Sequence, residues 1–129
     1  MNKVEHIALL VSDAPAMAEW YSSHLNMKVV RQGPPPRRMT FLADESGRTC
    51  FELYERTDVP TPDYASMHAS VLHLAFTSDD AAADHQRLVN AGAKEDGPID
   101  DTDAGDRLAW LRDPWGLAVQ LVQRKEALP

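Results

Sequence analysis

The fold of this chain is decided by VEHIAL at residues 4–9, which recurs as VLHLAF at residues 71–76. Each copy carries a histidine at its third position, and the two histidines are 67 residues apart. A second match follows, because FEL at residues 51–53 recurs as VQL at residues 119–121, 68 residues later. Two matches in the same order with nearly equal offsets indicate that the chain contains two copies of one structural unit.

The composition is that of a single globular domain spanning residues 1–129. Of the 129 residues, 43% are hydrophobic, which is enough for one core and too many for a disordered chain. The formal net charge of −7 argues against nucleic acid or an anionic membrane as a partner. No apolar run approaches the roughly 20 residues that span a bilayer. Cys50 is the only cysteine, and no signal-peptide pattern opens the chain, so we expect a cytoplasmic protein.

The first unit, residues 1–56, is predicted to have the order βαβββ. SDAP at residues 12–15 is typical of a helix start, since a capping oxygen stands before a proline in the first turn. Apolar residues then follow helical spacing up to Leu25, and Asn26 is placed to end the helix in a left-handed conformation. The predicted strands are residues 4–11, 27–31, 39–43 and 48–55, with a loop at residues 32–36.

The second unit, residues 71–129, repeats this order after a linker at residues 57–70. SDD at residues 78–80 is predicted to cap a helix that runs through Ala91 and stops at Gly92. The predicted strands are residues 71–77, 93–95, 107–112 and 117–123, with a loop rich in Asp and Gly at residues 97–106. Both units are therefore βαβββ, and the predicted fold class is α+β.

Four polar residues interrupt the apolar strands at matching positions of the two units: His6 with His73, and Glu52 with Gln120. Because strand side chains alternate between faces, each of the four is opposite bulky apolar neighbours that the helices can cover. On their own face most of them are flanked by small residues, such as Ala8 beside His6. Small side chains beside histidine and glutamate are more typical of a cavity wall than of a packed core.

A single histidine on an apolar strand is more often a hydrogen-bonded core residue than a ligand, and Glu52 alone could face solvent. Four such positions related by the repeat instead favour a site in which two imidazoles, a carboxylate and an amide bind a metal ion. The remaining histidines lack this pairing. His24 and His85 are predicted on helix surfaces, and His68 in the linker is a candidate to support a ligand or to contact substrate.

The chain resembles the vicinal oxygen chelate superfamily, which includes glyoxalase I, bleomycin-resistance proteins and extradiol dioxygenases. The likeness covers nearly the whole chain. Its markers are VEHIA at residues 4–8, WY at 20–21, LNMKVV at 25–30, FEL at 51–53, HLA at 73–75, DPWG at 113–116 and QL at 120–121. The resemblance implies two βαβββ modules paired into an open, cupped mixed sheet, with the helices on its convex face.

The resemblance also implies a site for one divalent metal ion (Fe, Ni, Zn, Mn or Co) and often a homodimer. The ligand positions carried over from the family are His6, Glu52, His73 and Gln120. Many catalytic members have Glu where this chain has Gln120, which leaves Glu52 as the carboxylate ligand and the candidate catalytic base. Tyr54, on the same face as Glu52, and Trp110 are candidates to contact a small-molecule substrate.

Three functions are compatible with this resemblance. The first is a glyoxalase-like lyase or isomerase whose substrate chelates the metal through two neighbouring oxygens, so that the ion stabilises an enediolate. The second is an Fe(II) extradiol-type dioxygenase of catechol-like substrates. The third is a non-catalytic, drug-binding protein of the bleomycin-resistance kind. Its stacking surface would come from Trp110, Trp115, Phe41 and Tyr64.

The sequence gives little information on the substrate. Leu10 and Arg56 stand where glutathione-using glyoxalases tend to carry Arg and Asn, which argues against lactoylglutathione. Arg37 and Arg38 could meet an anionic substrate, although two adjacent arginines in a loop are more typical of a solvated pair.

Overall fold

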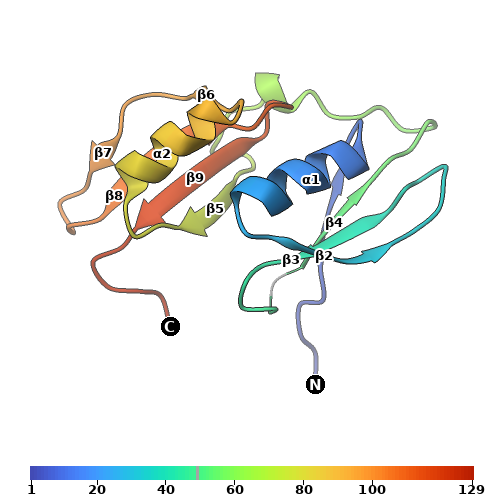
Figure 1. The fold of residues 1–129 in the computed structure, drawn as a ribbon, viewed down its shortest axis with the longest axis horizontal. Helices are drawn as coiled ribbons and strands as arrows, with labels where there is room; N and C mark the ends of the chain where they lie inside the picture. The colour runs from blue at the N-terminus through green and yellow to red at the C-terminus, as the bar shows by residue number, and fades with distance from the viewer. Residues whose placement is uncertain (49) are drawn as a thin grey trace. The chain divides into compact units, whose positions relative to one another are not determined.

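The computed structural model describes residues 1–48 and 50–129 and divides into two compact units, Met1–Pro62 and Asp63–Pro129. In the described residues each unit holds one α-helix against one mixed sheet (Figure 1). None of the helices among these residues is long and apolar enough to cross a membrane. The predicted α+β class and the two βαβββ modules are confirmed, with one short strand added to the second unit.

The first unit has its first and last strands side by side. Its elements are β1 (Ile7–Leu10), α1 (Ala14–His24), β2 (Lys28–Gln32), β3 (Thr40–Ala43) and β4 (Cys50–Tyr54). The sheet order is β1-β4-β3-β2, in which β1 runs parallel to β4 and the other pairs are antiparallel. The helix packs against the sheet (Figure 1), and the buried side chains of this unit include Met17, Tyr21, Leu42 and Leu53.

The second unit has the same topology. Its elements are the 3₁₀ helix η1 (Tyr64–Ser66), β5 (Leu74–Thr77), α2 (Ala81–Asn90), β6 (Lys94–Glu95), β7 (Asp100–Asp101), β8 (Arg107–Arg112) and β9 (Ala118–Gln123). The sheet order is β5-β9-β8-β6, with β7 paired to β8 and with β5 parallel to β9. The helix α2 packs on β8 and β9 over buried Leu88, Leu111 and Leu121.

The two helices begin with matching hydrogen bonds. Asp13 and Asp80 each accept a bond from a backbone N–H in the first turn, at 3.1 and 3.0 Å. The first N–H of α1 donates to Oε2 of Glu55 at 2.9 Å, and that of α2 donates to Oε1 of Gln123 at 2.9 Å. Because these N–H groups have no acceptor inside the helix, both units satisfy the same need in the same way.

The histidine-bearing strands begin later than predicted. His6 lies one residue before β1 and His73 one residue before β5, so neither histidine is within its strand. The apolar residues further upstream are exposed to solvent, Val4 to 78% and Val71 to 71%. Alternation of apolar and polar residues therefore extends beyond the paired part of each strand, since the pattern reports two faces and not the presence of a neighbouring strand.

Three other features correct the prediction. The loop at residues 97–106 contains β7, which was not predicted because its two residues are both aspartates. The linker at residues 57–70 contains η1, whose Tyr64 is 7% exposed. His85 is buried rather than on the surface, because it shares one face of α2 with Ala81 and Leu88 at helical spacing. The helix ends are as predicted, with Asn26 at φ 54° and Gly92 at φ 109°.

The turn between β8 and β9 holds η1 closely. Asp113 is 2% exposed, and its Oδ1 accepts bonds from the N–H groups of Trp115 and Leu117, both at 2.9 Å. Gly116 has φ +92°, and a Cβ placed on it would lie 2.6 Å from Cβ of Ala65 in η1. A glycine is therefore required there both by the backbone conformation and by the close approach of η1.

We expect Gly116→Ala to lower the free energy of unfolding by about 2 kcal/mol or more, because overpacking adds to the left-handed backbone penalty. Gly97→Ala is the matched control. Gly97 has φ +91°, and a Cβ added to it would meet nothing within 4 Å, so it carries the backbone penalty alone, about 1 kcal/mol. Urea unfolding of the two variants checks this, and equal losses would show that the contact with Ala65 is unimportant.

Candidate functional site

Glu52 lies on β4, in the middle of a group of side chains from three strands. Its cross-strand neighbours are Ala8 on β1 and Phe41 on β3. His6 precedes β1, and its ring meets the ring of Phe41 edge-on, with centroids 5.6 Å apart. Because β4 lies between β1 and β3, the ring of His6 reaches across β4 on the face that carries Glu52. The structure therefore brings His6, Phe41 and Glu52 to one face.

Gln120 has the same surroundings in the second unit. It lies on β9 between Ala75 on β5 and Trp110 on β8. The ring of His73, which precedes β5, meets Trp110 edge-on with centroids 4.8 Å apart. His73 therefore reaches across β9 as His6 reaches across β4. The small residues Ala8 and Ala75 leave room for the two rings.

Both groups lie on the sheet faces that point away from the helices. Glu55 bonds the first N–H of α1, and strand alternation then turns Glu52 and Tyr54 to the opposite face. Both side chains are half-buried there. The same alternation holds in β9, where Gln123 bonds α2 and the half-buried Gln120 points away.

Each histidine has an oxygen acceptor at Nδ1. Nδ1 of His73 lies 2.7 Å from the carbonyl oxygen of Ala69, and Nδ1 of His6 lies 2.9 Å from Oε1 of Glu5. A carbonyl or an ionised carboxylate only accepts, so in a neutral ring with this contact Nδ1 carries the proton and Nε2 keeps its lone pair. Metal-binding histidines have this arrangement, because their other ring nitrogen donates to an oxygen. The donor set thus fits a divalent metal with nitrogen and oxygen ligands.

Each unit supplies two of the four predicted ligands. The part of the chain that the structure describes holds no cluster of three or more His, Cys, Asp or Glu side chains suited to a metal ion. Metal binding by these four residues stays a prediction.

The sequence reasoning missed the groups that support the two histidines. The acceptors Glu5 and Ala69 carry no local pattern, since one is an adjacent side chain and the other a backbone carbonyl. The ring partners Phe41 and Trp110 are predicted from the sequence only as surfaces for a bound small molecule. They are 69 residues apart, close to the repeat offset, so the repeat could have identified them as equivalent.

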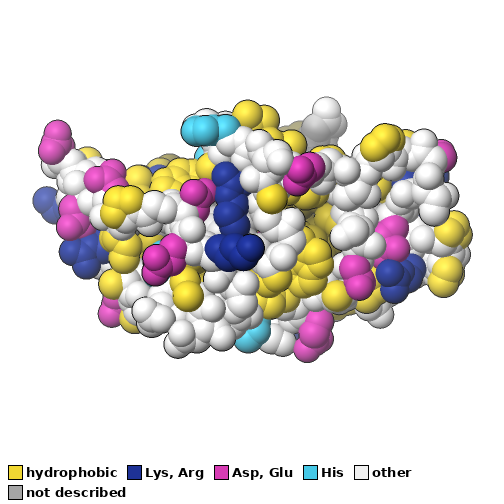
Figure 2. All heavy atoms as spheres, turned by 90° about the horizontal axis from the view of Figure 1, so that it is seen from above, with side chains coloured by type: hydrophobic (Ala, Val, Ile, Leu, Met, Phe, Trp, Pro, Cys, Tyr) yellow, Lys and Arg dark blue, Asp and Glu magenta, His cyan; other side chains and the backbone are white. Residues whose placement is uncertain are grey.

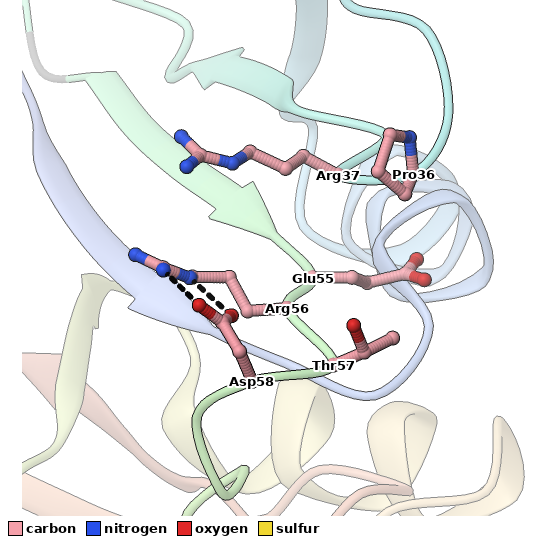
Figure 3. Close-up of a pocket in the computed structure, with 6 residues that line it drawn as sticks. All are labelled: Pro36, Arg37, Glu55, Arg56, Thr57 and Asp58. Carbon is pink, nitrogen blue, oxygen red and sulfur yellow. Dashed lines mark hydrogen bonds and ion pairs between the residues drawn. The ribbon is translucent and has the colours of Figure 1, made fainter.

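A shallow pocket of about 100 Å³ lies at the end of β4 in the first unit (Figure 3). Arg37 and Arg56 extend to the same side of it, whereas Glu55 points the other way, toward α1 (Figure 3). Nη2 of Arg38 lies 2.8 Å from Oε2 of Glu55, so Arg38 is an ion-pair partner rather than a solvated residue. The residues that line the pocket are Pro36, Arg37, Glu55, Arg56, Thr57 and Asp58.

The charges in this pocket are balanced by an ion pair. Arg56 donates from Nε to Oδ1 of Asp58 at 2.8 Å and from Nη2 to Oδ2 at 2.5 Å (Figure 3). These hydrogen bonds and the charge of Arg56 lower the pKa of Asp58, and the charge of Arg37 acts in the same direction. The pair is therefore ionised at neutral pH, and the guanidinium of Arg56 is already satisfied by a carboxylate.

The sequence matches the family model of the Glyoxalase/Bleomycin resistance protein/Dioxygenase superfamily over residues 3–121. The chain belongs to this superfamily. The match spans both modules of this superfamily member and includes the four predicted ligand positions. No curated protein matches the sequence.

Solved structures of superfamily members share the fold at low sequence identity. A glyoxalase family protein from Bacillus cereus is similar with a TM-score of 0.78 and 15% identity over 95% of each chain. An antibiotic-binding protein from a Streptomyces species has a TM-score of 0.71 and 22% identity, over 97% of this chain and 98% of that chain. A glyoxalase I mutant from Zea mays has a TM-score of 0.74 and 24% identity, over 94% of this chain but 45% of that chain. Identities this low show the fold and not the reaction.

We expect Arg56→Met to raise the pKa of Asp58 toward the ordinary value of an aspartate, because the hydrogen bonds that favour its carboxylate are removed. Because the pKa of Asp58 is lower in the folded chain than in the unfolded chain, the ion pair stabilises the fold at pH values above the unfolded pKa. This stabilisation is lost as the pH falls through the folded pKa. Carboxyl NMR titration measures this, with Arg31→Met as the control for an exposed arginine elsewhere in the unit. An unchanged midpoint in Arg56→Met would contradict the assignment.

Proposed function

We propose that this chain is a divalent-metal-dependent lyase or isomerase that acts on a small molecule with two neighbouring oxygen atoms. The observation that carries the proposal is the matched pair of His6 and His73. Each has Nδ1 within hydrogen-bond distance of an oxygen acceptor, and each reaches over the strand that carries Glu52 or Gln120. We propose these four side chains as the ligands of one metal ion, of the Fe, Ni, Zn, Mn or Co type.

In this proposal Glu52 is also the catalytic base. A bound divalent ion would supply Lewis-acid polarisation of two substrate oxygens. Glu52 is the one carboxylate of the four, and its half-buried position between Ala8 and Phe41 supports a role in removing a proton beside a substrate carbonyl. Tyr54 follows two residues later on the same face, where its hydroxyl can donate to a substrate oxygen. Trp110 offers a ring face or edge to the apolar part of the substrate.

Gln120 restricts the chemistry that this set can perform. Its amide oxygen can ligate a metal but is not a base at neutral pH. Proton removal and proton return would therefore both use Glu52. A single shuttling base suits an isomerisation, or a lyase reaction with one proton transfer between neighbouring carbons, better than a reaction that needs separate acid and base groups.

Binding without catalysis is the second candidate. The observation that favours it is the aromatic ring beside each histidine: Phe41 and Trp110 are half-buried on the same faces as the polar groups. Such rings provide stacking surface for a planar ligand. A similar structure is that of an antibiotic-binding protein, and the missing charge at Gln120 weakens the case for acid–base chemistry.

The extradiol dioxygenase alternative would use His6, His73 and Glu52 as three ligands of Fe(II). That set has the composition of the two-histidine, one-carboxylate arrangement of non-haem iron oxygenases. It differs from the lyase in one readily measured respect, since it consumes oxygen. An oxygen electrode with a catechol panel separates the two reactions.

We further propose that the chain forms one domain over residues 1–129 and assembles as a homodimer in the cytoplasm. Hydrophobic side chains reach the surface in several places (Figure 2). Among the large ones, Ile7 is 48% exposed and Val30 is 57% exposed. Exposed apolar residues on short strands are suitable for contact with a second copy of the chain. The single cysteine accords with a reducing compartment.

The decisive experiment is metal analysis of purified protein after loading with Ni, Zn, Mn, Co or, under nitrogen, Fe(II). We expect stoichiometric metal in the wild type and a rise in melting temperature with metal concentration, because the folded state alone has the preformed site. His6→Ala and Glu52→Ala should each lose the metal, with affinity reduced by more than about 100-fold, since even supporting residues are worth about 10–100-fold.

Glu45→Ala is the matched control for Glu52→Ala, because Glu45 is an exposed carboxylate in a turn of the same unit. It should bind metal as the wild type does. Folded wild-type protein that takes up none of these metals would overturn the metal-dependent enzyme and leave the binding protein. Metal uptake that persists in both His6→Ala and Glu52→Ala would overturn the ligand assignment.

A further inference from the structure

We propose that Arg112 is a positioning residue for His73. It holds the segment that precedes β5 against the sheet, so that the carbonyl of Ala69 accepts the Nδ1 proton of His73. The inference rests on the proposed function for the role of His73 as a metal ligand. It extends that function to a residue outside the ligand set and to a segment that the sequence predicts as a linker.

Arg112 connects β8 to this segment through its guanidinium. The side chain is 19% exposed, and Nη1 donates to the carbonyl oxygens of Met67 at 2.9 Å, Tyr64 at 3.1 Å and Gly116 at 3.3 Å. Nε donates to Oδ2 of Asp96 at 2.9 Å. Hydrogen bonds from a charged donor are roughly twice as strong as neutral ones. One side chain thus fixes both ends of the turn of η1 to the end of β8.

A short turn transmits this anchoring from Met67 to His73. The N–H of Val71 donates to the carbonyl of His68 at 2.9 Å, and the N–H of Ser70 donates to Nδ1 of His68 at 3.0 Å. The carbonyl of Ala69, inside this turn, lies 2.7 Å from Nδ1 of His73. Because the turn starts one residue after Met67, a fixed Met67 carbonyl leaves little freedom in where that of Ala69 points.

The sheet supplies the second contact of the His73 ring. Trp110 meets the ring edge-on at 4.8 Å, and it lies two residues before Arg112 on β8, so both side chains share one face. The ring therefore has two contacts, one with Trp110 directly and one with the carbonyl of Ala69, whose turn is anchored by Arg112. Trp110 and Arg112 both lie on β8, so both contacts depend on the position of that strand. A purely structural role would explain the bonds of Arg112 but not their convergence with Trp110 on the orientation of one imidazole.

The test is the state of the His73 ring in the metal-free protein, read from its side-chain nitrogen signals by NMR. The wild type should show the ring-nitrogen chemical shifts of the Nδ1–H form of His73. In Arg112→Met this signal should be lost or averaged with the Nε2–H form, while that of His6 stays unchanged, since His6 bonds to Glu5. Arg107→Met is the matched control, because Arg107 lies on the same strand and pairs with Asp101 instead.

Arg112→Lys is a second variant in case Arg112→Met does not fold. Lysine keeps the positive charge but lacks the forked set of N–H donors of the guanidinium. We expect an intermediate His73 signal in Arg112→Lys. We also expect metal affinity about 10–100-fold weaker in Arg112→Met, as for other residues that orient a ligand, with no change in Arg107→Met. Wild-type signals for His73 in folded Arg112→Met or Arg112→Lys would overturn the inference.

The NMR result for His73 can be distinguished from the metal-binding result that tests the proposed function. If wild-type protein binds no metal but shows the Nδ1–H of His73 and loses it in Arg112→Met, the positioning of the ring is supported and the ligand role of His73 is not. If the wild type binds metal but His73 carries its proton on Nε2, the inference is overturned and the metal-dependent function is not.

Discussion

Parallel pairing of the first and last strands of each unit is the constraint on which the rest of the structure depends. Parallel strands cannot be joined by a tight turn, so the chain between them has to form a helix and further strands before it returns. In this protein that return brings Ala8 beside Glu52 and Ala75 beside Gln120. Each histidine precedes the first strand of its unit, and the second predicted ligand, Glu52 or Gln120, lies on the last strand. Strand pairing thus makes neighbours of residues that are distant in the sequence.

The two units have matching hydrogen bonds at their helix starts but differ in charge at two matching positions. Glu55 and Gln123 both accept the first N–H of their helix, so the amide preserves the bond that starts α2. The carboxylate's attraction for the helix N-terminus, about 0.3–1 kcal/mol, is lost with it. Asp84 offsets this loss, because it supplies an acidic residue to the first turn of α2 where α1 has none.

Among the residues that the structure describes, the charge difference between Glu52 and Gln120 is not offset by a nearby acidic residue in the same way. Its consequence is chemical rather than structural. Glu52 and Gln120 occupy equivalent places between an alanine and an aromatic residue. The strand pairing of the two faces is the same, so the main difference is that the amide lacks the carboxylate's charge and basicity and adds N–H donors. In the proposed function this makes the first unit the source of the base and the second a source of neutral ligands.

Sequence reasoning predicted the features that repeat or follow local rules. Capping residues and left-handed ends at Asn26 and Gly92 set both helices, and alternation located the long strands. It failed where structure depends on contacts between distant segments. The start of β1 is fixed by its pairing with β4, and η1 is held by bonds from Arg112 to carbonyls 45 and 48 residues away. No local pattern records such contacts, so the four candidate ligands were predicted while their supports were not.

The supports of the two histidines differ in a way that bears on the proposed chemistry. His73 bonds to a backbone carbonyl that belongs to a turn anchored on β8. His6 bonds to Glu5, whose side chain is 86% exposed and free to exchange with water. A ligand held by anchored backbone keeps its geometry, whereas one held by an exposed carboxylate gains basicity but can shift. In the proposed function His73 would therefore be the more firmly oriented ligand, and His6 would lie in the unit that also holds Glu52.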